Sequence, residues 1–461
     1  MEHAGTERSV APEPTADARL GDERGHLTST VKHTLVYGLG TLAAKAIGFL
    51  MIPIYTRFLT PADYGTLELL SMTVDLLAFT AGLGLSWAVT RYYYAYDDPR
   101  ERGTVVSTAA TLMAALFALA TALALPLAPR LAQWLLADAR HAHLVRLALG
   151  VLLVFGFLEV PLAYLRARQD SVAFVRVSLT RFGLALVLNV VFVAFLRMGV
   201  AGVLYSTLLS STAVSVYLWG RTIRETGYAF SPRIARRLVR FGAPMVATEL
   251  GSFVLHYSDR YFLRVYDSLA GVGLYSLAYK FAMLLALFIA NPFAQIWIPK
   301  ALEIEKTEGP RAPAALREIL SHYNVVLVSA SLGIALFADD AIVVMAGSEF
   351  HPAGAIVPWL CLGILFFGYR PISQVGACIR ERSDLIAAGV ACGTLVVVVG
   401  NLTLIPRWGV FGAAVATFLA FASEFAVLLA LSERVYPLRF GIVRLLRPLL
   451  LGAVVYGAAR W

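Results

Sequence analysis

Apolar runs long enough to cross a lipid bilayer recur along almost the whole chain. A helix rises about 1.5 Å per residue, so about 20 apolar residues cross a hydrocarbon core of roughly 30 Å. The chain is 59% hydrophobic and only 15% charged, which is more apolar than a soluble core could bury. The sequence therefore predicts an all-α, polytopic membrane protein. The twelve runs of sufficient length are residues 34–54, 64–89, 105–128, 144–165, 172–196, 200–219, 241–262, 274–298, 319–338, 355–379, 386–405 and 410–431.

The two ends of the chain differ from this pattern. Residues 1–30 mix both charge signs and contain no apolar run, so we expect a disordered cytoplasmic tail. They also lack the short apolar core and cleavage site of a signal peptide. A short thirteenth apolar segment, residues 445–459, follows Arg439, Arg444 and Arg447. Its length is compatible with crossing the membrane, lying in the interface or capping the bundle.

Lysine and arginine are unevenly distributed between alternate loops. If the N-terminal tail is cytoplasmic, 26 of the 39 fall in segments on the cytoplasmic side and 8 in segments outside. Positive charge collects in cytoplasmic loops, so the count favours a cytoplasmic N-terminus. The net charge of +9 is thereby explained by topology, and we expect no nucleic-acid partner.

A weak internal repeat relates the two halves of the chain. Arg57 and its neighbours are echoed at Arg260, about 203 residues later. Six helices per half give both halves the same orientation, which predicts a pseudo-two-fold axis along the membrane normal and a central cavity between two six-helix bundles. The further matched segments are residues 165–170 with 379–384, Asn189 with Asn401, and residues 199–202 with 409–412.

The seam between the halves is basic. Ser231 is placed to cap a helix that has Pro232 at its first position. Four arginines on this helix suit anionic headgroups, although a simple positive-inside anchor is the interpretation that we favour. The expected organisation is a tail at 1–30, an N-terminal six-helix bundle at 31–222, a cytoplasmic basic amphipathic linker at 223–240, a C-terminal six-helix bundle at 241–435 and a short hydrophobic segment at 436–461.

Short motifs carry a resemblance to a known family. They comprise Pro53, Thr56-Arg57, Leu59 and Tyr64-Gly65, together with residues 83–84, 91–93 and 273–280. This set resembles the signature of the polysaccharide (O-antigen type) flippases of the multidrug, oligosaccharidyl-lipid and polysaccharide exporter superfamily. The resemblance covers nearly all of the chain after residue 30.

The resemblance implies both a location and a function. It implies a protein of the bacterial cytoplasmic (inner) membrane that flips a lipid-linked oligosaccharide by alternating access, for the synthesis of cell-surface polysaccharide such as lipopolysaccharide. The partners that it implies are a polyprenyl-diphosphate-linked oligosaccharide, membrane lipids and other membrane proteins of polysaccharide assembly.

Four basic residues are the candidates for binding substrate. A charge inside an apolar run costs at least a few kcal/mol unless it faces a cavity or a partner. Lys45 and Lys280 lie in the helices that lead each half, and Arg57 and Arg260 lie at the outer ends of the first and seventh helices. The resemblance implies that such arginines meet the substrate diphosphate, and the planar guanidinium fork matches phosphate. Snorkelling to headgroups or capping of carbonyls stays open for both arginines. Asp259 is placed to hold Arg260.

The acidic residues in apolar runs have two open roles. Asp75 and Glu249 could carry a coupling proton or sodium ion, or could neutralise a lysine. Gly389-x3-Gly393 is interpreted as a helix-packing motif. The remaining intramembrane charges are interpreted as structural pairs, namely Glu159, Arg181, Arg370 and Glu424.

Catalytic patterns are missing from the sequence. There is no glycine-rich Lys-Ser/Thr phosphate loop, no Ser-His-Asp set and no metal-ligand spacing among the three cysteines, so we expect neither an enzyme nor a cofactor. The alternatives are a small-molecule exporter of the multidrug branch, a lipid II flippase, and a membrane glycosyltransferase or polymerase of the same pathway. The four basic candidates favour an anionic cargo. The longest outer loop, residues 129–143, is short for an enzyme.

Overall fold

The computed structural model describes residue 49 and residues 51–460. The predicted tail at residues 1–30 and the candidate Lys45 lie outside the described residues. Within the described part every regular element is a helix, as expected from the apolar runs.

The helices fall into an N-terminal and a C-terminal lobe. The N-terminal lobe contains α2 (Ile52–Phe58), α3 (Pro61–Gly82), α4 (Leu85–Tyr93), α5 (Pro99–Ala124), η1 (Leu125–Leu127), α6 (Ala128–Leu136), η2 (Ala139–His141), α7 (Ala142–Ala167), α8 (Ser171–Asn189), η3 (Val190–Phe195) and α9 (Gly199–Thr226). The helix α10 (Pro232–Tyr266) follows. The C-terminal lobe contains α11 (Leu269–Ala282), η4 (Ala286–Ala290), α12 (Asn291–Glu308), η5 (Gly309–Arg311), α13 (Ala312–Met345), η6 (Ser348–Ile356), α14 (Val357–Gly368), α15 (Arg370–Ile379), α16 (Ser383–Val435) and α17 (Ile442–Arg460).

Eight helical runs in the described part are long and apolar enough to cross a membrane, or nine if the bent pair α3 and α4 is one span. The longest runs cover more than one predicted span. α16 leaves helical geometry at Gly409, where φ is 52° and ψ is −128°. A Cβ on Gly400 would lie 2.9 Å from the Ala416 Cβ, so the two parts of α16 pack side by side. α16 is therefore a hairpin of two helices.

Two pairs of positions matched in the sequence share a structural feature. Gly199 and Gly409, which the sequence matches, have φ values of 57° and 52°. Both therefore occupy the left-handed region that glycine adopts without steric cost. The matched residues Asn189 and Asn401 are both buried. The matched glycines thus share a positive φ, and the matched asparagines share burial.

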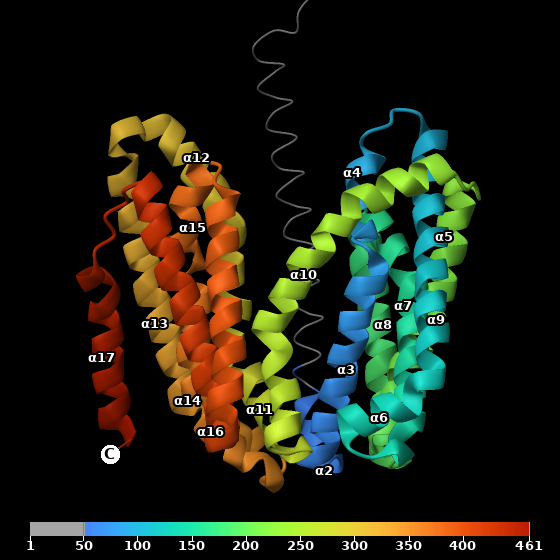
Figure 1. The fold of residues 1–461 in the computed structure, drawn as a ribbon, viewed down its shortest axis with the longest axis horizontal. Helices are drawn as coiled ribbons and strands as arrows, with labels where there is room; N and C mark the ends of the chain where they lie inside the picture. Colours follow the sequence, from blue (N-terminus) through green and yellow to red (C-terminus); the bar gives the residue numbers. More distant parts are fainter. Residues whose placement is uncertain (1–48, 50, 461) are drawn as a thin grey trace, which may run out of the picture.

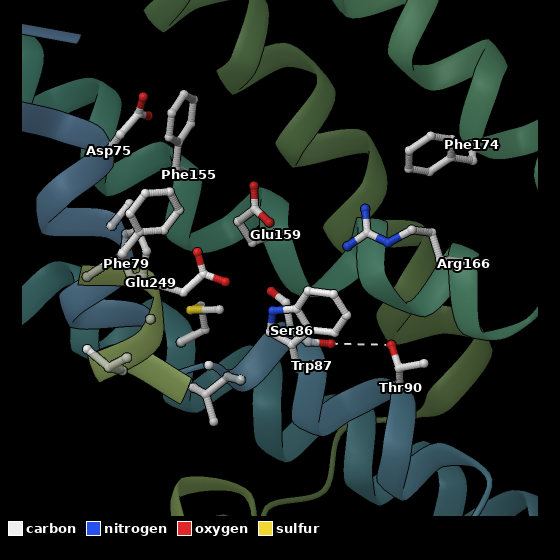
Figure 2. A pocket seen from close by; sticks show the side chains of 17 residues that line it. Asp75, Phe79, Ser86, Trp87, Thr90, Phe155, Glu159, Arg166, Phe174 and Glu249 are labelled. Carbon is white, nitrogen blue, oxygen red and sulfur yellow. Dashed lines mark hydrogen bonds between the residues drawn. The ribbon is translucent and has the colours of Figure 1, made fainter. Parts of the chain in front are cut away.

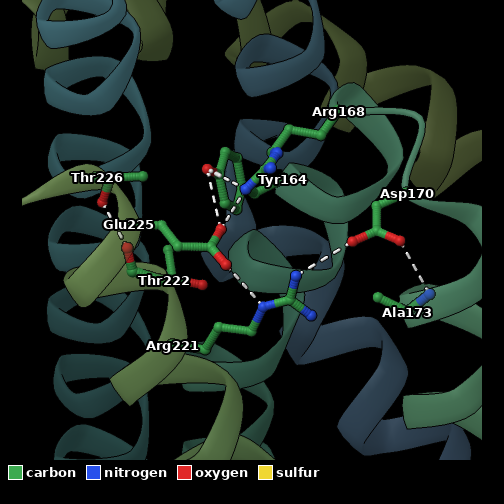
Figure 3. Close-up of polar contacts among 8 residues, drawn as sticks. All are labelled: Tyr164, Arg168, Asp170, Ala173, Arg221, Thr222, Glu225 and Thr226. Atoms are coloured by element: carbon green, nitrogen blue, oxygen red, sulfur yellow. Dashed lines mark hydrogen bonds and ion pairs between the residues drawn. The ribbon is translucent and has the colours of Figure 1, made fainter.

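The matched segments 165–170 and 379–384 also carry related ion pairs. Figure 3 shows Arg221 of α9 between Glu225 and Asp170, at 2.8 and 3.1 Å, while Arg168 pairs with the same Glu225. Asp170 also caps α8 by accepting from the Ala173 N–H at 3.0 Å. In the second half, Arg382 pairs with Asp384 at 2.8 Å. These pairs lie near the ends of α7, α8 and α9 and at the start of α16.

The two lobes meet at the end that carries α2 and α6 and diverge toward the end that carries α4 and α12 (Figure 1). α10 crosses between them. Near its start, the Phe241 ring packs 6.0 Å from that of Tyr92 on α4. Nearer its end, the Ser258 hydroxyl accepts from the Asn401 amide of α16 at 3.3 Å. This 35-residue helix therefore has one end in each lobe.

α10 contains both the predicted linker helix and the predicted seventh span. Ser231 caps it as expected, with its hydroxyl accepting from the Ile234 N–H at 3.4 Å and Pro232 in the first turn. The helix then continues from Arg240 into Phe241 without a break. Arg237 donates to the Tyr96 hydroxyl at 3.0 Å. The amphipathic segment is thus continuous with the helix that enters the second lobe.

Two glycines bring the lobes into contact at the end that carries α2 and α6. We call this end the closed end. A Cβ on Gly65 of α3 would lie 2.0 Å from the Leu269 carbonyl oxygen, and a Cβ on Gly273 of α11 would lie 1.9 Å from that of Pro61. These distances leave no room for any side chain. The two helices, one from each lobe, therefore cross backbone to backbone. We name Gly65 and Gly273 the glycine crossing.

A larger residue in the glycine crossing should open this end. In a chain whose Cys361, Cys378 and Cys392 are serine, Thr66→Cys provides a buried reporter beside the crossing. We expect Gly273→Val to raise the maleimide labelling rate of this reporter cysteine at least about fivefold, since overpacking costs about 1–3 kcal/mol. Gly183→Val on α8 is the matched control, because its Cβ meets no atom within 4 Å. Equal labelling rates in the two variants would contradict the crossing as the closing contact.

Candidate functional site

Lys280 joins the two lobes through a polar contact. Its Nζ donates to the Tyr64 hydroxyl at 2.7 Å and pairs with the Glu68 carboxylate. Tyr64 and Glu68 are one turn apart on α3, whose start is fixed by a capping box between Thr60 and Asp63. The Lys280 side chain is 41% exposed, whereas that of Glu68 is 14% exposed. The lysine is therefore both paired and accessible.

Arg260 lies in a sealed cage. It is 2% exposed, donates to Asp259 at 2.7 Å and to the His256 carbonyl at 2.8 Å, and stacks 4.0 Å from the Tyr279 ring centre. The Tyr275 hydroxyl donates to the other Asp259 oxygen at 2.5 Å. Asp259 thus holds Arg260 as the sequence indicated. In this conformation Arg260 has no access to a phosphate and stabilises the packing of α10 against α11.

Of the other two basic candidates only Arg57 is described, and it is not brought to Lys280. Arg57 lies exposed in the last turn of α2, at the closed end. Lys45 belongs to the part of the chain that the structure does not describe. The three described candidates therefore do not line one chamber in this conformation, and the joint role of all four in binding substrate stays a prediction.

A cavity of about 760 Å³ lies on the N-terminal lobe beside α10. Figure 2 shows Asp75, Glu159 and Glu249 around it, together with Arg166. Aromatic side chains from α3, α4, α5 and α7 form much of the remaining wall. The three carboxylates have no hydrogen-bond or ion-pair partner among the described residues. We name this space the acidic cavity.

The acidic cavity brings together Asp75 and Glu249, the two residues expected to share a coupling role. Neither neutralises Lys280, because Glu68 does so. Glu159 lines the cavity, and its carboxylate attracts the Arg181 guanidinium, so its interpretation as part of a structural pair stays a prediction. Within residues 49 and 51–460, no group of three or more His, Cys, Asp or Glu side chains is arranged to hold a metal ion.

A second charged pair matches the sequence interpretation. Arg370 at the start of α15 donates to Glu424 of α16 through Nε at 2.9 Å and Nη2 at 2.8 Å. Glu424 is buried, and a Cβ on the nearby Gly393 would lie 3.1 Å from its Cβ. The motif Gly389-x3-Gly393 therefore packs the two parts of α16 together as predicted. This pair stabilises the C-terminal lobe.

Sequence reasoning missed Glu68. It lies in the second apolar run, as Asp75 does, and the cost of a charge there was a usable signal. Its place one turn after Tyr64 put both side chains on the same helix face. The partner, Lys280, is 212 residues further along the chain, so the sequence alone does not predict that the two side chains pair.

The fold is that of a two-lobed polytopic membrane transporter. The protein is similar to a lipid II flippase, MurJ, in an inward closed conformation, with a TM-score of 0.75 and 15% identity over 92% of this chain and 93% of that one. It is also similar to a multidrug resistance MATE family transporter of the MOP superfamily in an inward-facing conformation, with a TM-score of 0.69 and 18% identity over 86% and 95% of the two chains.

The profile of the family described as "Polysaccharide biosynthesis protein" matches residues 54–355, and the chain belongs to this family. The resemblance found in the sequence motifs is thereby confirmed. The chain is 25% identical to the succinoglycan biosynthesis transport protein ExoT of Rhizobium meliloti, over 76% of this chain and 67% of that protein. It is 25% identical to the lipid III flippase of Escherichia coli, over 86% and 97%. A match to the probable low-salt glycan biosynthesis flippase Agl15 of Haloferax volcanii spans 40% of that protein at 24% identity.

Removing one partner of the Arg260 cage should destabilise the protein. Asp259→Asn leaves a buried guanidinium without its counter-ion, which costs about 3–5 kcal/mol. We expect its thermal midpoint in detergent to fall clearly below that of the Asp259→Leu/Arg260→Met double variant, which removes both charges. Arg57→Gln should change the midpoint little, because Arg57 is exposed. A single variant as stable as the double one would refute a structural role for this pair.

Proposed function

We propose that this protein flips a lipid-diphosphate-linked oligosaccharide from the cytoplasmic to the outer leaflet of the bacterial inner membrane by alternating access. The observation that carries the proposal is a chain of the polysaccharide biosynthesis family folded into two lobes that meet at one end only (Figure 1). The names of its relatives, which include a glycan flippase and a lipid III flippase, support this substrate class. The role is to change which leaflet holds the glycan and not to alter the glycan.

The diverging end faces the cytoplasm in this proposal. It carries the loops that the charge count assigns to the cytoplasmic side. The likeness to MATE transporters supports an inward-facing state, because the TM-score is 0.69 for an inward-facing structure and 0.57 for an outward-facing one. Headgroups would then enter between the lobes from the cytoplasmic leaflet. The remaining partners would be membrane lipids and other membrane proteins of polysaccharide assembly.

Lys280 is the substrate contact that this conformation supports best. A cation in a low-dielectric site needs a counter-ion, since an unpaired buried charge costs several kcal/mol. Glu68 supplies that counter-ion in the structure. A substrate diphosphate would replace it, and the released Glu68 carboxylate would repel the diphosphate. Because Glu68 and Lys280 lie on different lobes, this exchange would weaken the closed end when substrate binds.

Asp75 and Glu249 are proposed to couple transport to a cation. Both line the acidic cavity, where carboxylates outnumber the one arginine. A proton or sodium ion bound there would reduce repulsion among the carboxylates and change how α3 packs against α10. The same acidic lining favours a second candidate function, the export of small organic cations. Translocation assays with a lipid-linked oligosaccharide and with a cationic dye separate the two.

Removal of the Lys280 charge should reduce flipping. We expect Lys280→Ala to lower translocation of a lipid-linked oligosaccharide in proteoliposomes about tenfold or more, because a hydrogen bond to a charged group contributes about 1.5–3 kcal/mol. The control is Lys300→Ala, which removes an exposed lysine paired with Glu303 on α12.

The double variant Lys280→Ala/Glu68→Ala decides what Lys280 does. If Lys280 contacts substrate, the double variant stays defective. If Lys280 only neutralises Glu68, removal of both charges restores transport. The assignment of Lys280 as a substrate contact would then be wrong. The mass of the glycan is measured in the same samples, and its lengthening would indicate a polymerase.

Loss of the cavity carboxylates should uncouple transport. We expect the wild type to respond to an imposed proton or sodium gradient, and Asp75→Asn/Glu249→Gln to lose most of that response while retaining slow exchange between leaflets. Glu303→Gln is the control, since Glu303 is exposed on α12. A double variant that responds to the gradient as the wild type does would exclude these residues from coupling.

A further inference from the structure

The last helix is attached to the outside of the C-terminal lobe. α17 stands alongside α13 at the edge of the molecule farthest from the N-terminal lobe (Figure 1). Its start is fixed by Asn324 of α13, whose amide donates to the Arg444 carbonyl at 2.9 Å and the Leu445 carbonyl at 3.4 Å. The Tyr369 hydroxyl donates to the Asn324 amide oxygen at 2.7 Å and so orients it. The predicted thirteenth segment is therefore a helix that packs along the bundle.

A basic hollow of about 590 Å³ opens between α13 and α17 near this attachment. Three arginines line it, Arg317 from α13 and Arg444 and Arg447 from α17. None of the three forms an ion pair with a carboxylate of the described residues. Ser321 and His322 also line the hollow, and Glu318 is its one acidic side chain. The hollow thus carries an excess of positive charge that no protein group balances.

An apolar groove of about 310 Å³ continues along the same two helices. On α13 its lining begins at Val328, about one turn after the last residue of the hollow. On α17 its lining begins at Leu449, directly after the hollow ends at Pro448. α14 closes the groove with Trp359 among other residues. The seam between α13 and α17 is therefore charged at one end and apolar along the next two turns.

This arrangement matches an amphiphile with an anionic head. Arginine forks bind phosphate oxygens, and basic pockets between helices on the cytoplasmic side recognise anionic headgroups. The outer face of α17 is apolar, with Leu450, Leu451 and Val454 each at least 60% exposed, so the seam opens toward lipid and not toward water. The occupant therefore comes from the bilayer.

We propose that an anionic phospholipid binds in the seam between α13 and α17, with its phosphate against Arg317, Arg444 and Arg447 and an acyl chain in the apolar groove. α17 lies on the outer side of the C-terminal lobe, away from α3 and α11, the helices that carry Glu68 and Lys280 (Figure 1). The lipid is thus distinct from the transported substrate. It links α17 to the lobe by filling the space that direct helix contact leaves. This inference does not depend on the proposed function.

The test compares lipids on the purified full chain. Native mass spectrometry and thermal midpoints are measured in detergent with phosphatidylglycerol, with phosphatidylcholine and with inorganic phosphate. We expect bound phosphatidylglycerol and a raised midpoint, and neither effect with phosphatidylcholine or phosphate. Equal effects of the two phospholipids, or an equal effect of phosphate alone, would overturn the proposal.

Two variants locate the site. Arg444→Gln/Arg447→Gln should lower the apparent affinity for phosphatidylglycerol at least about tenfold. Lys306→Gln/Arg311→Gln is the matched control, because it removes the same charge from exposed positions near the start of α13 and outside the hollow. Ala453→Trp fills the apolar groove without changing charge and should also weaken binding. Unchanged binding in the arginine variant, or binding of a polyprenyl diphosphate in preference to phosphatidylglycerol, would refute the assignment.

Discussion

The structure depends on the rule that a charge within an apolar helix needs a counter-ion or an open cavity. Three intramembrane cations obey it in different ways. One pair is local, one lies inside the C-terminal lobe and one joins the two lobes. Only the last pair must break if the lobes separate at their closed end. The pairs are Arg260 with Asp259, Arg370 with Glu424, and Lys280 with Glu68.

The sequence predicted what local chemistry determines. The helices, the Ser231 cap, the matched glycines at 199 and 409, and the adjacency of Asp259 to Arg260 follow from nearby residues. It did not predict which candidate cations meet. The cost of a buried charge predicts that a partner exists. It does not identify that partner, because Glu68 and Lys280 are far apart along the chain. Grouping four basic residues into one chamber assumed a single conformation, whereas Arg260 is sealed in this one.

The proposed substrate contact and the proposed coupling carboxylates occupy different places. The accessible lysine lies at the junction of the lobes, and the free carboxylates lie in the acidic cavity beside α10. An anionic substrate and a coupling cation require opposite potentials, and at low dielectric like charges placed together repel strongly. In the proposed mechanism this separation would let both operate in one protein. α10 contributes Glu249 to the cavity and extends into the second lobe, so it is the element that we propose to link the two events.

The attachment of α17 follows from the physics of helices in lipid. No hydrophobic driving force holds an apolar helix against its neighbours in a bilayer, so close packing and polar contacts must do so. α17 has a hydrogen-bonded start at Asn324 and one close approach, where a Cβ on Gly452 would lie 3.3 Å from Val328. Between and beside these contacts the seam is hollow. The proposed lipid, anionic at one end and apolar at the other, would fill that seam and reduce the repulsion among the three arginines.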